Sequence, residues 1–245
     1  MNNIISIFND FKEDFVFNFI DGDRWKWLVD GLLVTLQVTF FSVLLGIVIG
    51  VVLALIRSTH DTNISTIGNP IARNLLKFAN MIAKIYLTVI RGTPVVVQLM
   101  LIYYVILVSV DSKILVASLA FGINSGAYVA EIVRSGIMSI DKGQFEAGRS
   151  LGLSYTQTMT QIIIPQALKN VLPALANEFI VLLKETSVSG YVALQDLTKA
   201  GDLIRSRTYS AFMPLIAVAL IYLVLVLFFT KLVEILERRL RNSDH

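Results

Sequence analysis

The sequence predicts an all-α membrane protein with five transmembrane helices, and three observations support this fold class. The chain has 245 residues, of which 55% are hydrophobic and 16% charged. Its mean hydropathy is +0.70, outside the usual balance of a soluble domain. The run at 32–56 holds 25 residues without a charge. A helix of that length exceeds the roughly 30 Å hydrocarbon core of a bilayer.

Four further apolar segments come after it, at about 85–110, 114–136, 169–188 and 209–231. If the first span runs from outside to inside, thirteen of the 21 lysines and arginines fall in cytoplasmic segments or at their edges. The positive-inside rule therefore predicts an external N-terminus and a cytoplasmic C-terminus. Because the basic residues flank the spans, we expect no nucleic-acid binding despite a pI near 9.1.

Residues 28–240 are expected to form a single transmembrane domain, since no stretch outside the spans is long enough to bury its own core. Residues 1–27 are acidic, so we expect them to be retained rather than cleaved as a signal peptide. Their aromatic and aliphatic residues allow an amphipathic helix on the membrane surface, and a mobile external arm fits equally well. Residues 241–245 are expected to form a cytoplasmic tail.

The segments between the early spans predict how these spans connect. Residues 58–70 have the composition of a loop. From Pro70 a helical pattern resumes, which favours one long helix that starts in the cytoplasm and leads into the second span. Only a few residues around 110–113 join the second and third spans, which predicts an antiparallel hairpin. The chain has no cysteine, and we expect no metal site at the lone loop histidine, His60.

A polar segment of about 30 residues lies between the third and fourth spans, on the predicted cytoplasmic side. Asp141 can cap a short helix whose first turn includes Glu146, Gly152 permits a sharp break, and Pro165 stops or bends the helix after it. We therefore expect a helix, a turn and a second helix that returns to the membrane. An ordinary amphipathic helix on the inner leaflet explains the same residues.

This segment, EAGRSLGLS followed by IIIPQAL, resembles the cytoplasmic loop of membrane subunits of bacterial ATP-binding-cassette importers. Gly148 and Ile164 stand where that family usually has alanine and leucine. Three other stretches are similar to the polar amino acid branch of the family, which includes histidine, glutamine and arginine permeases. They are RGTPVVVQL from Arg91, AYVAEIVR from Ala127 and NEFIVLLKETS from Asn177. With the loop, the resemblance covers residues from about 28 to 240.

The resemblance implies a type I importer fold and a role in amino acid uptake across the bacterial inner membrane. Two such subunits, identical or related, would stand above two ATPase subunits, and an external binding protein would deliver the cargo. The partner ATPase would bind ATP and magnesium, because this sequence has no Gly-x-x-x-x-Gly-Lys-Ser/Thr phosphate loop. The chain itself would be a transport subunit without a cofactor rather than an enzyme. The positions implied for coupling to the ATPase are Glu146, Ala147, Gly148, Arg149, Gly152 and Leu153.

Charges inside a bilayer cost about 2.5–3.5 kcal/mol each, so each one needs a partner or a water-filled cavity. Glu178 lies near the middle of the fourth span, and we expect it to meet the ammonium group or cationic side chain of a substrate. A structural hydrogen bond across the dimer is the alternative. The other candidates for contact with the cargo are Asn124 and Ser125 in the third span, and Leu182 and Thr186 on the helical face of Glu178.

Two further groups are candidates for gating or a hinge. At the start of the second span, glycine and proline allow a kink and a threonine can satisfy the freed carbonyl, although a purely structural role fits as well. These residues are Arg91, Gly92, Thr93 and Pro94. In the fourth span, Lys184 and Glu185 are candidates for an external gate. Alternatively, the side chain of Lys184 extends to the lipid headgroups. Glu131 is expected to pair with Arg134 on the same helix.

Three other functions compete with the importer. A stand-alone secondary carrier or channel is the runner-up, and it would need no docking loop. An intramembrane enzyme is disfavoured, because the chain has only two histidines and no Ser/His or His/Asp arrangement at one depth. A structural assembly factor is the third. Copurification with a soluble nucleotide-binding partner separates the importer from these alternatives.

Overall fold

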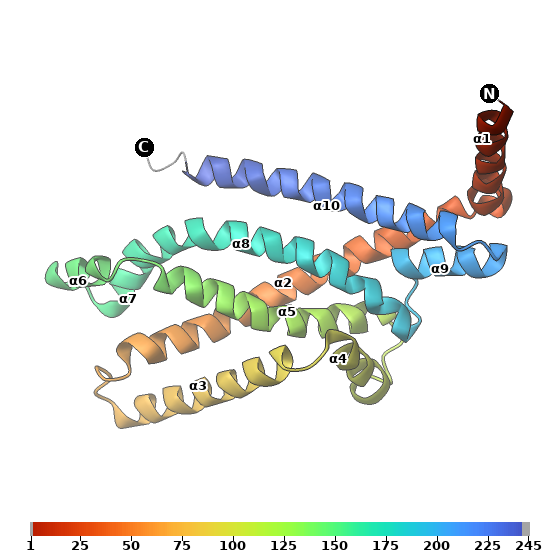
Figure 1. Ribbon diagram of the computed structural model, residues 1–245. Coiled ribbons are helices and arrows are strands. Elements are labelled where there is room, and N and C mark those ends of the chain that lie inside the picture. Colours follow the sequence, from red (N-terminus) through yellow and green to blue (C-terminus); the bar gives the residue numbers. More distant parts are fainter. Residues whose placement is uncertain (1, 242–245) are drawn as a thin grey trace.

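The computed structural model describes residues 2–241, and Met1 and residues 242–245, most of the predicted tail, lie outside the described part (Figure 1). Within residues 2–241 every regular element is a helix, which confirms the all-α fold class. The α-helices are α1 (Asn2–Phe15), α2 (Trp25–Asn63), α3 (Pro70–Arg91), α4 (Val95–Leu101), α5 (Lys113–Met138), α6 (Lys142–Ser150), α7 (Tyr155–Thr158), α8 (Ile164–Glu185), α9 (Leu197–Thr208) and α10 (Phe212–Arg241). Short π-helical or 3-10 segments are η1 (Val16–Ile20), η2 (Asp21–Asp23), η3 (Ile102–Ile106), η4 (Met159–Ile163) and η5 (Thr186–Val192).

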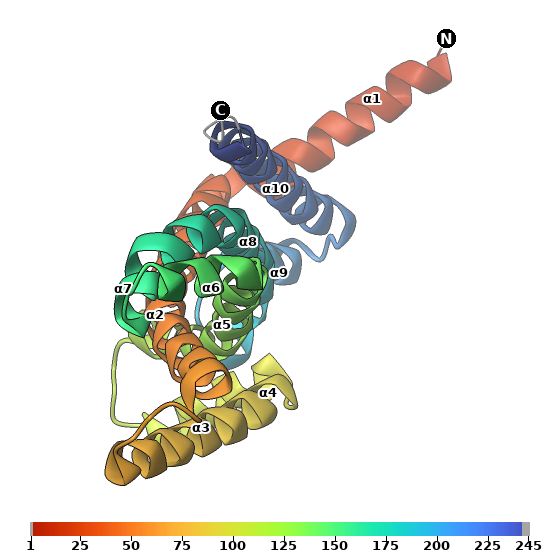
Figure 2. The same ribbon diagram turned by 90° about the vertical axis from the view of Figure 1, so that its left-hand side faces the viewer.

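The long helices run lengthwise and give the molecule two distinct ends. In Figure 1, α6 and α7 lie at the left end, beside the C-terminal end of α2 and the start of α3, whereas α1 and α9 lie at the right end. Figure 2 looks along this length from the left and shows α2, α5 and α8 in the middle, with α3 below and α10 above. The α6–α7 segment and α1 are therefore separated by the full length of the bundle.

Three of the described helices, α2, α5 and α10, are each long and apolar enough to cross a bilayer. The pair formed by α3 and Val95–Ile106 is a fourth candidate if its two bent halves count as one span. Helix α8, which corresponds to the predicted fourth span, carries Glu178, Lys184 and Glu185 and is not among these candidates. The count of five spans therefore stays a prediction.

The second predicted span differs in shape from the expectation. Asn69 caps α3 by accepting hydrogen bonds from the backbone N–H groups of Ile71 and Ala72, which confirms the predicted start at Pro70. The prediction of one long helix is wrong, because α3 ends at Arg91 and the chain turns by 107° before it continues. The break occupies Gly92–Pro94, because proline cannot continue the hydrogen-bonding pattern of the preceding helix.

The predicted loop at 58–70 is shorter than expected, because α2 continues to Asn63. Thr62 donates a hydrogen bond to the carbonyl of Ser58, 2.8 Å away, and Ser58 is itself buried. The Thr62 hydroxyl also lies 3.0 Å from the Tyr155 hydroxyl of α7. Contacts with α7 therefore hold the end of α2 in a helix where the composition alone favours a loop.

Helices α2 and α5 approach closely because glycines occupy both sides of their contact. An added Cβ at Gly50 would lie 2.4 Å from a methyl carbon of Val129 and 2.8 Å from the backbone nitrogen of Ala130. From the other side, an added Cβ at Gly126 would lie 2.8 Å from a methyl carbon of Ile49. Small residues let two helix backbones approach closely in a membrane. This contact fixes the position of α5 in the middle of the bundle.

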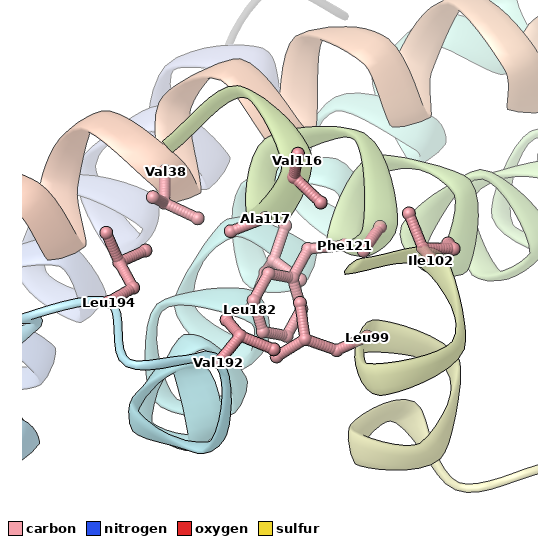
Figure 3. Packing of buried hydrophobic residues seen from close by; sticks show 10 residues of the cluster. Val38, Leu99, Ile102, Val116, Ala117, Phe121, Leu182, Val192 and Leu194 are labelled. Atoms are coloured by element: carbon pink, nitrogen blue, oxygen red, sulfur yellow. The ribbon is translucent and has the colours of Figure 1, made fainter. Parts of the chain in front are cut away.

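The apolar core next to this contact joins six elements (Figure 3). Phe121 of α5 is fully buried and packs with Leu99 of α4 and Leu182 of α8. The cluster also includes Val38 of α2, Ile102 of η3 and Val192 of η5. The cluster holds the bent α4 against α5 and α8. It therefore positions the polar side chains that lie one to two helical turns further along α5 and α8.

Candidate functional site

The candidate site is a line of buried polar side chains between α4, α5 and α8. Ser125 of α5 donates a hydrogen bond of 2.8 Å to the Oε1 atom of Glu178 on α8. The adjacent Asn124 donates through Nδ2 to the Oε1 atom of Gln98 on α4, at 2.9 Å. All four side chains are less than one-tenth exposed. The structure therefore brings Glu178 together with Ser125, which binds one oxygen of the carboxylate within the chain.

Gln98 connects this site to the break in the second span. Its Nε2 atom donates to the Thr93 hydroxyl at 2.7 Å and to the Ile90 carbonyl at 2.8 Å. Because both acceptors lie where α3 ends, the amide holds the backbone of the break beside α5. Gln98 was missed as a site residue, although an amide within the apolar run VVVQLML is itself a signal, since polar groups are costly in a bilayer.

The other two predicted cargo contacts on α8 and η5 are fully buried in this conformation. Leu182 belongs to the apolar core shown in Figure 3. Thr186 donates to the carbonyl of Leu183 at 2.9 Å, and its hydroxyl lies 3.5 Å from that of Thr39 on α2. These two residues would need a movement of α8 before they touched a solute.

The two candidate gating groups have different surroundings. Arg91 lies at the end of α3, where its Nη1 atom is 3.9 Å from Glu131 and its guanidinium carbon is 5.9 Å from the centre of the Tyr128 ring. Lys184 is exposed at the end of α8 nearer to η5, and the neighbouring Glu185 is half-buried. Arg91 is therefore tied to α5, whereas the side chain of Lys184 is open to the surroundings of the chain.

The predicted pairing of Glu131 with Arg134 is wrong. Glu131 forms its ion pair with Arg57 of α2, and Arg134 pairs with Asp61 of α2 at 2.7 Å. Both pairs cross between helices, because the glycine contact brings α2 close enough for its basic and acidic residues to reach α5. The sequence indicates which face of a helix a charged residue occupies. It does not indicate whether the ion-pair partner lies on the same helix or on a neighbouring one.

The α6–α7 segment has the predicted shape of helix, turn and helix. Asp141 caps α6 by accepting a hydrogen bond of 2.6 Å from the backbone N–H of Gly143. The turn after α6 contains Gly152, which has a φ of 77°. The N–H of Gly152 donates to the Arg149 carbonyl and that of Leu153 to the Gly148 carbonyl, the pattern of a Schellman motif. Glu146 lies in the second turn of α6, not in the first as predicted.

The predicted coupling residues do not all face outward. Glu146, Ala147, Arg149 and Gly152 are exposed, and Leu151 between them is 78% exposed. Gly148 is buried, and an added Cβ there would lie 2.7 Å from a methyl carbon of Thr158. Its place in the motif is thus explained by close packing of α6 on α7. The outward residues form a small surface at one end of the bundle.

Pro165 does not end the helix that precedes it. It is the second residue of α8, and proline is tolerated in the first turn of a helix. The chain therefore runs as one continuous helical path from Tyr155 through η4 to Glu185. Glu178 therefore lies on the same helical path as α7.

Comparison with protein families matches residues 46–242 to the family described as binding-protein-dependent transport system inner membrane component. The arginine transport system permease protein ArtQ of Bacillus subtilis (strain 168) is 38% identical over 221 residues, which cover 89% of this chain and 94% of that protein. The glutamine transport system permease protein GlnP of Escherichia coli (strain K12) is 35% identical over 218 residues, 87% of this chain and 93% of that protein.

The fold matches a solved structure over nearly all of its length. A chain in the crystal structure of an amino acid ABC transporter with histidines superposes with a TM-score of 0.77 and is 41% identical. The match covers 90% of this chain and 98% of that chain.

Proposed function

Because the chain belongs to the family of binding-protein-dependent transport system inner membrane components, we propose that it forms the translocation path of an ATP-driven importer for polar amino acids. It is a permease subunit with the type I importer fold, and the hydrolysis of ATP belongs to a separate subunit. The observation that carries the proposal is the exposed outer surface of the α6–α7 segment, which bears the motif that such subunits present to their ATPase.

The proposed cargo is derived from the chemistry of the buried site and the names of the relatives. ArtQ and GlnP are named for arginine and glutamine, and both solutes carry an ammonium and a carboxylate group. Glu178 offers a carboxylate, and Asn124 and Gln98 offer amides that can donate or accept. This set matches a zwitterionic or cationic amino acid.

The proposed assembly contains two copies of the permease layer, identical or related, two ATPase subunits and an external binding protein. We place the α6–α7 segment on the cytoplasmic side, which puts the N-terminus outside and the C-terminus inside. In support, α10 ends at the same end of the bundle as α6 and α7 (Figure 1). Its last turns contain Arg238, Arg239 and Arg241, as the positive-inside rule requires of a cytoplasmic end.

The proposed coupling route has two branches from the α6–α7 segment. One branch is the continuous helical path from α7 through η4 into α8 and Glu178. The other crosses to α2 through the hydrogen bond between Tyr155 and Thr62, and the adjacent pair of Asp61 and Arg134 continues it from α2 to α5. Closure of the ATPase dimer would move both branches as rigid helices, which is the usual form of alternating access.

Uptake into vesicles tests the proposed function directly. Vesicles that contain this chain, its partner ATPase and the binding protein should accumulate labelled arginine, glutamine or histidine only when ATP reaches the ATPase domains. The control is the same vesicle with an ATPase variant that binds ATP without hydrolysing it. Accumulation that continues with this variant, or without any ATPase, would show a stand-alone carrier.

Replacing Gly152 with valine is expected to uncouple ATP hydrolysis from uptake. Gly152 has a φ of 77°, where a β-branched residue is strained by about 1–3 kcal/mol, so the turn after α6 would rearrange. The measurement is the number of solutes taken up per ATP hydrolysed in vesicles. An added Cβ at Gly152 meets nothing within 4 Å, so strain rather than a clash causes the effect.

The matched control is Gly152→Asn, because asparagine adopts positive φ far more readily than valine. We expect this variant to keep most of the coupling. Equal coupling in the valine and asparagine variants would contradict the assignment of this turn to the ATPase contact.

A further inference from the structure

The N-terminal helix α1 stands apart from the bundle and has a fixed direction. In Figure 1 it points nearly at a right angle to the length of the bundle, and in Figure 2 it extends away from the other helices. A helix that crosses the end of the spans at this angle has the direction that a helix on a membrane surface takes. Its residues precede 46–242, the part matched to the transport family.

The connection between α1 and α2 is rigid rather than a loose linker. Phe19 of η1 is 5% exposed and packs with Leu28 of α2 and with Leu197 and Ile204 of α9. Asn18 is fully buried, and its Nδ2 atom donates to the carbonyl of Asp14 at 2.8 Å. Because these contacts anchor η1 on α9, the direction of α1 is set by the fold.

Aromatic side chains lie on one face of α1. Phe11 and Phe15 are four residues apart in the α-helix and so share a face. The rings of Phe15 and Phe19 are 5.1 Å apart, so Phe15 lies beside the residue that anchors η1 in the bundle. Phe11 is 53% exposed and Phe15 46% exposed, so neither is covered by the chain itself.

The polar face of α1 lies on the other side. Glu13 is about 180° around the helix from the midpoint between Phe11 and Phe15 at 100° per residue, and Asp10 is nearer to Glu13 than to Phe15. Both acids are exposed. Exposed Trp25 begins α2, the first long apolar helix, and aromatic residues are frequent at the boundary between lipid and water.

We propose that α1 is an interfacial helix that binds the lipid surface, with Phe11 and Phe15 among the acyl chains and Glu13 toward water. The partner is the bilayer itself, because α1 lies across the end of the long apolar helices and its exposed Phe11 and Phe15 lie opposite Glu13 on the helix. With the N-terminus outside, the leaflet is the outer one. The helix would hold the external end of the permease at a fixed depth while the spans move.

The absence of cysteine from the chain makes a direct test possible. Single-cysteine variants Phe11→Cys and Glu13→Cys would carry a nitroxide label in the assembled transporter, in vesicles of phosphatidylethanolamine and phosphatidylglycerol. Collisions of the label with oxygen, which concentrates in lipid, are compared with collisions with a water-soluble nickel complex. We expect the oxygen-to-nickel ratio to be several-fold higher at position 11 than at position 13. Phe15→Cys and Asp10→Cys form a second matched pair. In these two variants Phe11 and Glu13 are unchanged.

Two outcomes would overturn the proposal. Equal, nickel-dominated ratios at both positions would mean that α1 lies in water. A label at position 11 that becomes shielded from oxygen and nickel only when the binding protein is added would mean that the face binds that protein instead. The uptake experiment does not depend on either of these outcomes. If α1 does not bind lipid, the proposed transport function therefore still stands.

Discussion

Replacing Gly50 with alanine should destabilise the permease, although alanine is the better helix former. Alanine is favoured over glycine in a helix by about 1 kcal/mol, so an open site would gain stability. At Gly50 the new Cβ would lie 2.4 Å from Val129 and 2.8 Å from the backbone of Ala130, which cannot move aside without displacing α5. Overpacking typically costs about 1–3 kcal/mol, and a clash with backbone belongs at or above the upper end. The loss therefore exceeds the gain.

The measurement is the midpoint of thermal unfolding and the yield of monodisperse protein in detergent. Gly50→Ala should lower both, and Gly50→Leu should prevent recovery of folded protein. Gly68 is the matched control, because an added Cβ there meets nothing within 4 Å and its φ is not positive. Gly68→Ala should leave the midpoint unchanged. A Gly50→Ala variant as stable as Gly68→Ala would show that α2 and α5 do not pack as closely as described.

The sequence predicts those parts of the structure that depend on local signals. The predicted helix boundaries that depend on local signals are confirmed: Pro70 starts α3, Asp141 caps α6, and Gly152 forms the turn that ends it. Each signal acts on backbone groups within four residues, so no knowledge of the fold is needed. The all-α class likewise results from the length of the apolar runs.

Features that depend on the neighbouring helices could not be predicted in this way. Glu131 pairs with Arg57 rather than with Arg134, because the glycine faces bring α2 within reach of α5. Helix α2 extends to Asn63 because Tyr155, 93 positions after Thr62, binds its end. Spacing along the chain indicates the face of a helix on which a residue lies, and not which other helix meets that face.

The candidate site was predicted in part for the same reason. Glu178 and Ser125 are polar residues deep in apolar segments, and the structure places the Ser125 hydroxyl 2.8 Å from the Glu178 carboxylate. Gln98 satisfies the same criterion, and its connection to Thr93 depends on the 107° turn that folds α4 back beside the break. The sequence indicated that a kink was possible there, and the packing of α4 on α5 determines its size.

Replacing Glu178 with glutamine should reduce uptake by about 10- to 100-fold while the complex still assembles. A hydrogen bond between charged groups is worth about 1.5–3 kcal/mol, and each 1.4 kcal/mol is a factor of ten in affinity. Glutamine has the same shape as glutamate and can still accept the hydrogen bond from Ser125, so only the negative charge is lost. Uptake of arginine should fall at least as much as uptake of glutamine, since arginine carries a second positive charge.

Basal ATP hydrolysis by the assembled transporter distinguishes a cargo contact from a structural role for Glu178. With a cargo contact, hydrolysis without cargo stays near the level of the unchanged transporter in Glu178→Gln. Ser125→Ala is the complementary variant, because it removes the 2.8 Å hydrogen bond and keeps the carboxylate. Its effect on uptake should be smaller, since a neutral hydrogen bond contributes only about 0.5–1.5 kcal/mol. If Glu178→Gln fails to assemble, or if Ser125→Ala reduces uptake as much, the carboxylate holds α8 against α5 and does not bind the cargo.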